Sequence, residues 1–214
     1  MPDHDAAREG LPNGGGSALR NVCVYCGSSP GADPAFAKAA EELGRLLAEA
    51  GLGLVYGGGD VGLMGITARS VLRHGGHVTG IIPDFLRRRE NMLDAAQETI
   101  IVPDMHTRKQ LMFDRSDAFV ALPGGVGTLE ELVEQMTWSQ LGRHTKPILL
   151  LDVNGFWRPL IDLLAHMRLN GFIRAGLELN YGVAEKVEDL IPMMEASYRR
   201  RGGQENAAFI EEHF

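Results

Sequence analysis

The chain alternates between short apolar runs and segments in which apolar residues recur at helical spacing, and this alternation constrains the fold more than any other feature. The runs NVCVYC, LGLVY and AFVAL are apolar at nearly every position rather than at every second one. Strands of this kind are buried on both faces, as in a parallel sheet that helices cover on each side. The sequence therefore predicts an α/β fold with a doubly wound parallel sheet.

The boundaries of these elements follow from caps, prolines and glycines. Strands are expected at residues 21–26, 52–56, 77–82, 99–102, 118–122, 147–152 and 177–181. Helices are expected at about 34–50, 62–74, 104–116, 128–141, 156–169 and 187–199. Asp33 followed by Pro34 is typical of a helix start. We expect one folded domain over residues 21–200, between a polar, disordered tail at 1–20 and a tail or arm at 201–214.

The composition limits the partners of this chain. Among 214 residues the formal net charge is −7, so the protein as a whole will not seek nucleic acid or an anionic membrane. No apolar run approaches the roughly 18 residues of a spanning helix, and no apolar segment near the start resembles a secretory signal. We therefore expect a cytoplasmic protein. The seven histidines show no metal-binding spacing, so neither a metal nor a cofactor is expected.

Cys23 and Cys26 form a C-x-x-C pair inside an apolar run. A redox C-x-x-C opens a helix, whereas residues three apart on a strand point to opposite sides. Because there is no second C-x-x-C, zinc binding is not indicated either. We predict that both are small, buried core residues.

The first glycine turn, in VYGGGDVGLMG, follows the second predicted strand. Gly57, Gly59 and Gly62 match the G-x-G-x-x-G outline of a dinucleotide site, with Asp84 farther along the chain. The match is weak, because glycines are common at such turns and the usual site follows the first strand. Two alternatives stay open: a tight turn for close helix packing, and a backbone cradle for one phosphate or ribose.

The second glycine turn, PGGVGTLEE, follows the strand AFVAL. Gly124, Gly125 and Gly127 leave backbone N–H groups unshielded, and Thr128 is predicted to open a helix. Bare amides and the positive end of a helix dipole together favour an anion. Because no Gly-Lys-Ser/Thr follows, the turn is not a Walker loop, and a monophosphate is favoured over a triphosphate with magnesium.

Glu131 has two interpretations. Thr128 and Glu131 have the T-x-x-E spacing of a capping box, in which the glutamate accepts a hydrogen bond from the Thr128 amide. Alternatively, a carboxylate next to a bound sugar phosphate can stabilise an oxocarbenium ion or activate water. The spacing alone favours the cap, and the adjoining anion site favours the catalytic role.

Basic residues occur where a helix dipole disfavours them. Arg108 and Lys109 lie in the first turns of a helix that Asp104 is expected to cap, although acids are preferred there. An anionic ligand would explain the two cations, and solvated side chains are the alternative. The arginine runs at 87–89 and 199–201 are typical of solvated faces, although the first is also a candidate for the edge of a cleft.

Four segments, in this order, resemble the LOG (Lonely Guy) family: VYCGSS, VYGGGDVGLMG, DMHTRKQLMFDRSDAFVALPGGVGTLEE and TWSQLGRHTKPILLLDVNGF. The resemblance covers about residues 21–195, and the pairing of M-H-x-R-K with PGGxGTxxE is specific. It implies a Rossmann-like fold and a hydrolase of cytokinin biosynthesis. Such an enzyme cleaves the N-glycosidic bond of cytokinin riboside 5′-monophosphates, and of AMP, to free base and ribose 5-phosphate. A homodimer or larger homo-oligomer is also implied.

The resemblance assigns roles to individual residues. It places the catalytic residues at Arg108 and Glu131. The substrate-binding positions fall on Glu90, Arg108, Lys109, Gly124, Gly125, Val126, Gly127, Thr128, Leu129 and Glu130. Further candidate ligand contacts are Ser28, Gly58 and Gly59. The family often has an aromatic residue where this chain has Val126, which puts the packing around the base or ribose in question.

Other functions stay open from the residues alone. A nucleotide- or cofactor-carrying protein without catalysis would share the fold and the glycine cradle. A dinucleotide-dependent oxidoreductase would use the first glycine turn. Sequences of this kind often carry the label lysine decarboxylase, but the chain has no apparent pyridoxal-lysine motif.

Overall fold

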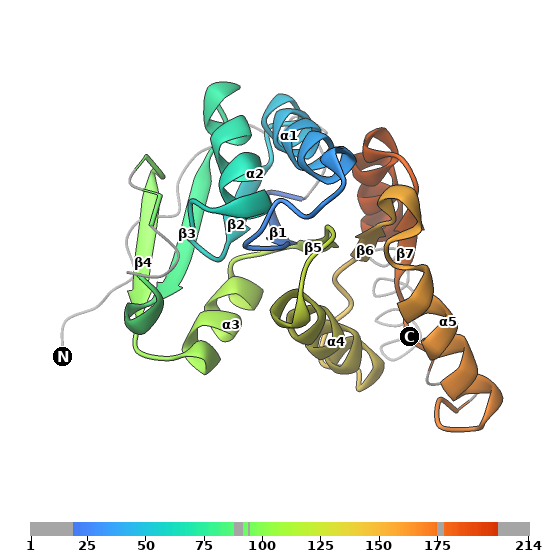
Figure 1. Ribbon diagram of the computed structural model, residues 1–214. Coiled ribbons are helices and arrows are strands. Elements are labelled where there is room, and N and C mark those ends of the chain that lie inside the picture. Colours follow the sequence, from blue (N-terminus) through green and yellow to red (C-terminus); the bar gives the residue numbers. More distant parts are fainter. Residues whose placement is uncertain (1–18, 88–91, 94, 175–177, 201–214) are drawn as a thin grey trace, which may run out of the picture.

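The computed structural model describes residues 19–87, 92–93, 95–174 and 178–200 (Figure 1). Within these ranges seven strands form one sheet in the order β4-β3-β2-β1-β5-β6-β7, and each strand runs parallel to its neighbours. The strands are β1 (Asn21–Tyr25), β2 (Gly53–Tyr56), β3 (Val78–Pro83), β4 (Glu98–Val102), β5 (Ala118–Ala121), β6 (Ile148–Leu151) and β7 (Gly182–Ala184). The predicted parallel α/β sheet is confirmed.

The strand order reverses at β1. The chain runs outward from β1 through β2 and β3 to β4, and then returns to add β5 on the other side of β1. Tyr25 and Ala121 are paired in the register, so β1 and β5 end at the same level. In open α/β sheets, the crevice outside the carboxyl ends of strands at such a reversal binds ligands.

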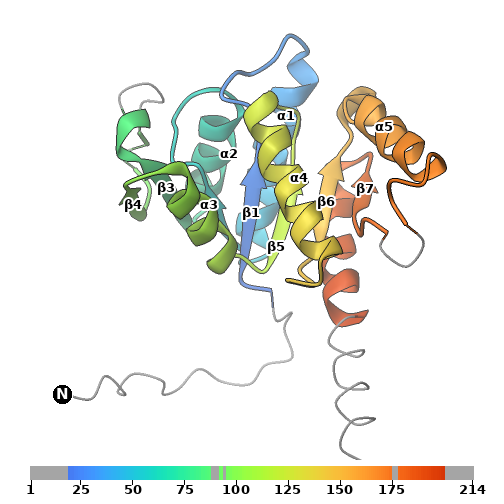
Figure 2. The same ribbon diagram turned by 90° about the horizontal axis from the view of Figure 1, so that it is seen from below.

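Helices cover both faces of the sheet (Figures 1 and 2). They are α1 (Pro34–Glu49), α2 (Gly62–Arg73), α3 (Met105–Asp114), α4 (Val126–Gln140) and α5 (Arg158–Leu169), with 3₁₀ turns at Asp84–Leu86, Val153–Gly155 and Val187–Asp189 and helical residues at 190–200. One core lies beneath α1, α2 and residues 190–200, and the other beneath α3, α4 and α5. This is the doubly wound, Rossmann-like arrangement that the sequence predicts.

In the central strands β1, β2, β5 and β6, successive residues supply the two cores in turn. In β1, Val22 and Val24 belong to the core beneath α1 and α2, whereas Cys23 and Tyr25 belong to the core beneath α3 and α4. Because both faces are buried, nearly every strand position is apolar. The cysteine prediction is confirmed, since Cys23 and Cys26 are free, buried and located in opposite cores.

The last strand lies farther along the chain than predicted. The sequence predicts a strand at 177–181, whereas β7 is Gly182–Ala184. Tyr181 instead packs, partly buried, against the core beneath α5. At Gly182 an added Cβ would lie 2.5 Å from Leu149 Cδ2. The Leu149 and Met193 side chains therefore pack closely over this glycine, and a strand that begins with a glycine does not form an apolar run.

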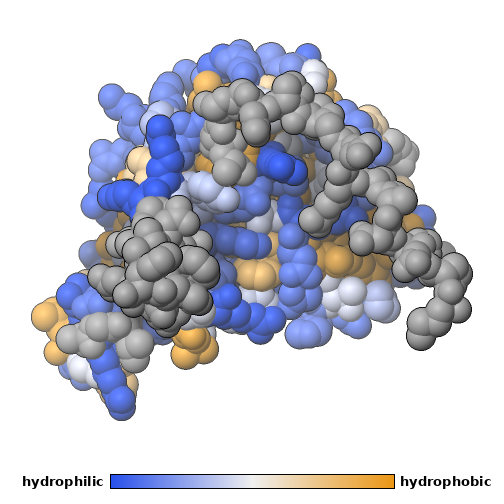
Figure 3. Space-filling model, turned by 180° about the vertical axis from the view of Figure 1, so that it is seen from behind, coloured by the Kyte–Doolittle hydropathy of each residue, from blue (hydrophilic) through white to orange (hydrophobic). Residues whose placement is uncertain are grey.

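The outer surface seen in Figure 3 is mainly hydrophilic, with separate hydrophobic patches. Leu19, the first residue that the structure describes, is buried. The backbone amides of the next two residues, Arg20 and Asn21, both donate to Asp117 Oδ2. The remaining residues of the two predicted tails lie outside the described ranges. No helix in the described part of the chain has the length and apolarity needed to cross a membrane.

Candidate functional site

A cavity of about 330 Å³ opens at the point where the strand order reverses. The loop after β1 lines it with residues 26–28, and the first turn of α4 lines it with residues 125–128. Arg108 on α3 and Glu131 on α4 face the same cavity. The structure therefore brings the two predicted catalytic residues together at the edge of the sheet where a ligand is expected.

The first turn of α4 has no side-chain cap of its own. Its N-cap is Gly125, whereas Asp33 caps α1 and Asp104 caps α3 through their carboxylates. The Leu129 amide donates to the Gly125 carbonyl at 3.0 Å, so the amides before Leu129 have no partner within the helix. Unshielded amides at the positive end of a helix dipole form an anion site. This supports the anion cradle predicted from the glycines.

The helix α4 starts two residues before the predicted position, and the capping-box interpretation of Glu131 is therefore wrong. Thr128 is the third residue of α4 rather than its cap, and it is only 4% exposed. An added Cβ on Gly124 would collide with the Thr128 side chain, which shows that Thr128 packs back against the glycine turn. Glu131 consequently lies in the second turn of α4, beyond the capping-box position.

Arg108 is buried although it carries a charge. Its side chain lies one turn into α3, and the residue is 6% exposed. Nη2 donates to the Gly57 carbonyl at 3.3 Å, and Nη1 lies 3.7 Å from the Met105 sulfur. Nε has no hydrogen-bond partner among the described residues. Because burial of a charge is costly without a partner, the adjoining cavity is suited to an anion.

Gly57 makes room for this guanidinium. An added Cβ there would collide with Arg108, so the space beside the first glycine of the dinucleotide outline is occupied by a protein cation. The glycine turn also follows β2, which is not at the reversal point of the sheet. Asp84 is exposed and paired with Arg87 at 3.2 Å. The geometry therefore does not support a dinucleotide site.

Glu131 and Arg108 both act electrostatically on Cys23 in β1. Burial raises the pKa of the Cys23 thiol. The negative charge of Glu131 raises this pKa further, whereas the positive charge of Arg108 lowers it. Burial also raises the pKa of the Cys26 thiol, with Glu131 as the next contribution. Two opposite charges, one from each of two helices, thus lie within electrostatic reach of β1 and line the same cavity.

Lys109 binds carboxylates and is not among the described residues that line the cavity. Its Nζ donates to Glu130 Oε1 at 2.5 Å and to Glu134 Oε1 at 3.0 Å. Burial by itself would lower the pKa of this ammonium, but the hydrogen bonds to the two carboxylates outweigh burial and leave the pKa raised. Lys109 is therefore a charged link between α3 and α4.

Most of the predicted site residues lie together. Those that line the cavity are Ser28, Arg108, Gly125, Val126, Gly127, Thr128, Glu130 and Glu131. Gly124 lines a neighbouring cavity of about 200 Å³ beside Phe36 and Phe156. Glu90 lies outside the described residues.

Besides Lys109 and Gly124, three further predicted contacts do not line the cavity. Leu129 is partly exposed on the surface of α4. Gly58 packs under Ile82, where an added Cβ would be 3.0 Å from Ile82 Cβ, and Gly59 forms an isolated bridge with Met92. The two glycines therefore shape the turn after β2 rather than the cavity wall.

The apolar wall of the cavity is not evident from the sequence. Met64 from α2, Leu86 from the turn after β3 and Met105 from α3 line it. These residues belong to separate elements, so no local spacing connects them. The only sequence signal is their position shortly after strand ends, where a parallel sheet gathers its loops.

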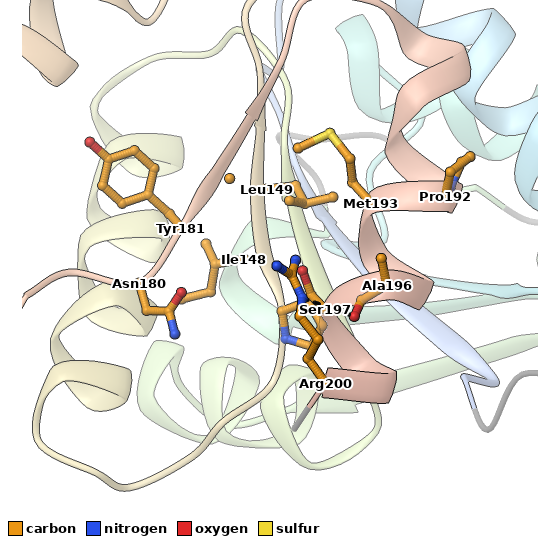
Figure 4. Close-up of a pocket in the computed structure, with 11 residues that line it drawn as sticks. Ile148, Leu149, Asn180, Tyr181, Pro192, Met193, Ala196, Ser197 and Arg200 are labelled. Carbon is orange, nitrogen blue, oxygen red and sulfur yellow. Dashed lines mark hydrogen bonds between the residues drawn. The ribbon is translucent and has the colours of Figure 1, made fainter. Parts of the chain in front are cut away.

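A second cavity, of about 340 Å³, lies at the amino ends of β6 and β7, against helical residues 190–200 (Figure 4). Its polar side chains include Tyr181, Ser197 and Arg200, and its described lining contains no acid. The first cavity is therefore the candidate active site because of its chemistry, not its size. Among the described residues, no group of three or more His, Cys, Asp or Glu side chains could hold a metal ion.

Comparison with curated proteins identifies the family. The chain is 45% identical over 195 residues to a protein from Oryza sativa subsp. japonica named probable cytokinin riboside 5'-monophosphate phosphoribohydrolase LOGL1, covering 91% of this chain and 87% of the relative. It is 44% identical over 179 residues to cytokinin riboside 5'-monophosphate phosphoribohydrolase LOG2 of Arabidopsis thaliana, covering 84% of each. The chain belongs to the LOG family. The predicted family is thus confirmed.

A sequence profile described as "Possible lysine decarboxylase" matches residues 64–194 of this chain. A pyridoxal-phosphate decarboxylase would need a lysine in its active site to hold the cofactor. The described lining of the cavity contains no lysine, and the ammonium of the nearby Lys109 is bound by two carboxylates. The residues of this LOG-family site therefore do not fit pyridoxal phosphate.

Solved structures show the same fold at lower identity. A molybdenum cofactor binding protein from Rippkaea orientalis aligns with a TM-score of 0.63 and 24% identity, covering 83% of this chain and 96% of that chain. A molybdenum cofactor carrier protein from Chlamydomonas reinhardtii aligns with a TM-score of 0.63 and 21% identity, covering 85% and 99%. These likenesses concern the fold of the LOG-family domain alone.

Proposed function

We propose that this protein is a phosphoribohydrolase that cleaves the N-glycosidic bond of cytokinin riboside 5′-monophosphates, and of AMP, to free base and ribose 5-phosphate. The observation that carries the proposal is the shared cavity of Arg108 and Glu131 beside the uncapped start of α4. The names of the LOG relatives support the same activity.

The phosphate is proposed to bind the first turn of α4. Residues 124–128 supply the glycine turn and its amides, and the positive end of the helix dipole favours the negative charge. The buried guanidinium of Arg108, with Nε still unpartnered among the described residues, adds a cation to the same cavity. A monophosphate fits this arrangement without a metal ion, since the protein itself supplies the positive charge.

The ribose is proposed to face Glu131. The bond from the anomeric carbon to the base nitrogen breaks, and its electron pair leaves with the base. The Glu131 carboxylate stabilises the positive charge that develops on the anomeric carbon and accepts a proton from the attacking water. The water oxygen bonds to the anomeric carbon, the departing base takes a proton from solvent water, and Glu131 returns its proton to solvent. The products are thus free base and ribose 5-phosphate.

The base is proposed to lie against the apolar wall formed by Met64, Leu86 and Met105. Thioether and aliphatic side chains accommodate flat rings and their apolar substituents. Glu90, which lies outside the described residues, remains a proposed substrate contact. We assign the phosphate to Arg108 and the start of α4. Lys109 and Glu130 instead form an ion pair with each other, which fits a link between α3 and α4.

Release of free base tests this function directly. Purified protein is incubated with AMP and with isopentenyladenosine monophosphate, and adenine or isopentenyladenine is measured by chromatography. Release that is lost in Arg108→Ala and in Glu131→Gln supports the hydrolase. Nucleotide binding without any turnover in the wild type would contradict it and favour a carrier protein.

We also propose that the protein forms a homodimer or larger homo-oligomer. Val126, Leu129 and Val133 follow one another at helical spacing along the outer face of α4 and are 83%, 36% and 40% exposed. Apolar side chains that continue from the cavity lip along a helix favour a partner surface. Light scattering coupled to size exclusion measures the mass, and a monomer at all concentrations would contradict the proposal.

A cytoplasmic location is proposed as well. The two free, buried thiols fit a reducing compartment. Fractionation of cells that express the tagged protein tests the location, and recovery outside the cytoplasm would contradict it.

A further inference from the structure

We propose that Lys109 is a positioning residue, which fixes α3 against α4 and thereby sets Arg108 opposite Glu131. This inference rests on the catalytic roles proposed above for Arg108 and Glu131. It differs from the substrate-binding role that the family resemblance implies for Lys109 and Glu130.

Lys109, on α3, contacts residues from two successive turns of α4. Glu130 and Glu134 are four residues apart and therefore lie on one face of the helix, and the Lys109 ammonium bonds both, at 2.5 and 3.0 Å. In sequence, Lys109 adjoins Arg108 and Glu130 adjoins Glu131. The charged clamp and the catalytic pair are thus carried by the same turns of the same two helices.

Burial makes the clamp rigid. The side chains of Lys109 and Glu134 are 15% and 22% exposed, so both charges are largely withdrawn from water. Glu134 Oε2 is buried without a hydrogen-bond partner among the described residues. A shift of α3 that withdrew the ammonium would leave this carboxylate uncompensated, which is costly. The two helices are therefore held in one relative position.

The local charges argue against direct capture of the phosphate by Lys109. One ammonium faces two carboxylates, so this cluster is negative overall. A phosphate at Lys109 would meet Glu130 and Glu134, whereas a phosphate at Arg108 meets a guanidinium whose Nε is unpartnered among the described residues. The anion consequently belongs to Arg108, and Lys109 acts through the helices.

Lys109→Met and Glu134→Ala, singly and together, test the clamp. A displaced Arg108 should lower kcat for AMP about 10- to 100-fold, because small misplacements of catalytic groups have effects of this size. KM should change less than about threefold. The double variant should lose no more than the worse single variant, since each change releases the same contact. Arg115→Gln, which breaks the exposed ion pair with Glu98 at the end of α3, should leave kcat unchanged.

Glu134→Ala distinguishes a positioning role of Lys109 from direct binding of the phosphate by Lys109. If Lys109 held the phosphate, removal of a competing carboxylate would free the ammonium and lower KM for AMP. Lys109→Met would then raise KM at unchanged kcat. Either result would overturn the proposal, whereas a fall in kcat in both variants supports it.

A second readout does not depend on turnover. In urea unfolding, the losses of stability in the two single variants should not add in the double variant, because the two side chains share one interaction. Additive losses would overturn the clamp. If the wild type releases no base from any nucleoside monophosphate, the proposed function fails, while this coupling still reports on the link between α3 and α4.

Discussion

The guanidinium of Arg108 rests on the backbone of Gly57. Nη2 donates to the Gly57 carbonyl at 3.3 Å, and the space that a Cβ would fill is taken by the guanidinium. Arg108 is carried by α3 and Gly57 follows β2, so this contact ties a helix-borne cation to the edge of the sheet. The position of the cation in the cavity thus depends on a residue that has no side chain.

Gly57→Ala should displace this guanidinium and lower kcat/KM for AMP by about 10²-fold, because the new methyl group occupies its place. The chain should stay folded, because the guanidinium belongs to a long side chain that can move. Steady-state base release measures the loss, and circular dichroism monitors the fold.

The same substitution in an Arg108→Ala background is the matched control. With the guanidinium already absent, the methyl group has nothing to displace, and no further loss of activity is expected. Equal losses in both backgrounds would show that Gly57 acts through something other than Arg108.

Glu131→Gln should lower base release by about 10² to 10⁴, because the variant cannot accept the proton of the attacking water. The variant should stay folded, since glutamine has nearly the shape of glutamate and Glu131 does not hold the capping-box position of α4. Urea unfolding and base release are measured on the same preparation, with the exposed Glu188→Gln as control. A destabilised variant with full activity would contradict the catalytic role and show that Glu131 is only structural.

Local signals predicted the framework well. Strand β1 is apolar throughout because both of its faces are buried, and Asp33 and Asp104 mark the helix starts that they cap. The start of α4 could not be placed in this way. Its cap is Gly125, which has no side chain to signal a cap, so Thr128 was the nearest recognisable candidate.

The site was predicted in parts, and the links between the parts are tertiary. An uncapped glycine turn and a cation near a helix start are local patterns, and both pointed to an anion. The contact between Arg108 and Gly57 joins residues 51 apart, and that between Lys109 and Glu134 joins residues 25 apart. Such distances depend on how the sheet assembles, and no spacing in the sequence encodes them.

Asp152→Ala should lower the free energy of unfolding by about 2–3 kcal/mol, because two charge-assisted hydrogen bonds are lost. Asp152 follows β6 and is 3% exposed, and it accepts from the Trp157 amide at 2.7 Å and from Arg158 Nε at 2.8 Å. Urea unfolding measures the change. Glu185→Gln is the control: Glu185 bonds the same arginine at 2.6 Å but is exposed, so its removal should change stability by less than about 0.5 kcal/mol.

The buried thiols should make the protein less stable at alkaline pH. Burial raises the pKa of both Cys23 and Cys26 above the usual 9.0. Above about pH 9 the unfolded chain releases these protons while the folded chain keeps them, so the folded state binds more protons and stability falls as pH rises. The full contribution is present below pH 9.0, and each thiol adds a slope of up to about 1.4 kcal/mol per pH unit.

Urea unfolding at about pH 8 and about pH 10 checks this slope in the wild type and in Cys23→Ala and Cys26→Ala. Each variant should be less stable at the lower pH, because a small cavity replaces the thiol. Each should also lose less stability between the two pH values than the wild type does. The remaining slope includes Tyr25, since burial raises the pKa of its phenol and it too is ionised only in the unfolded chain. A slope that is the same in all three proteins would contradict the raised thiol pKa values, whatever the cavities do to stability.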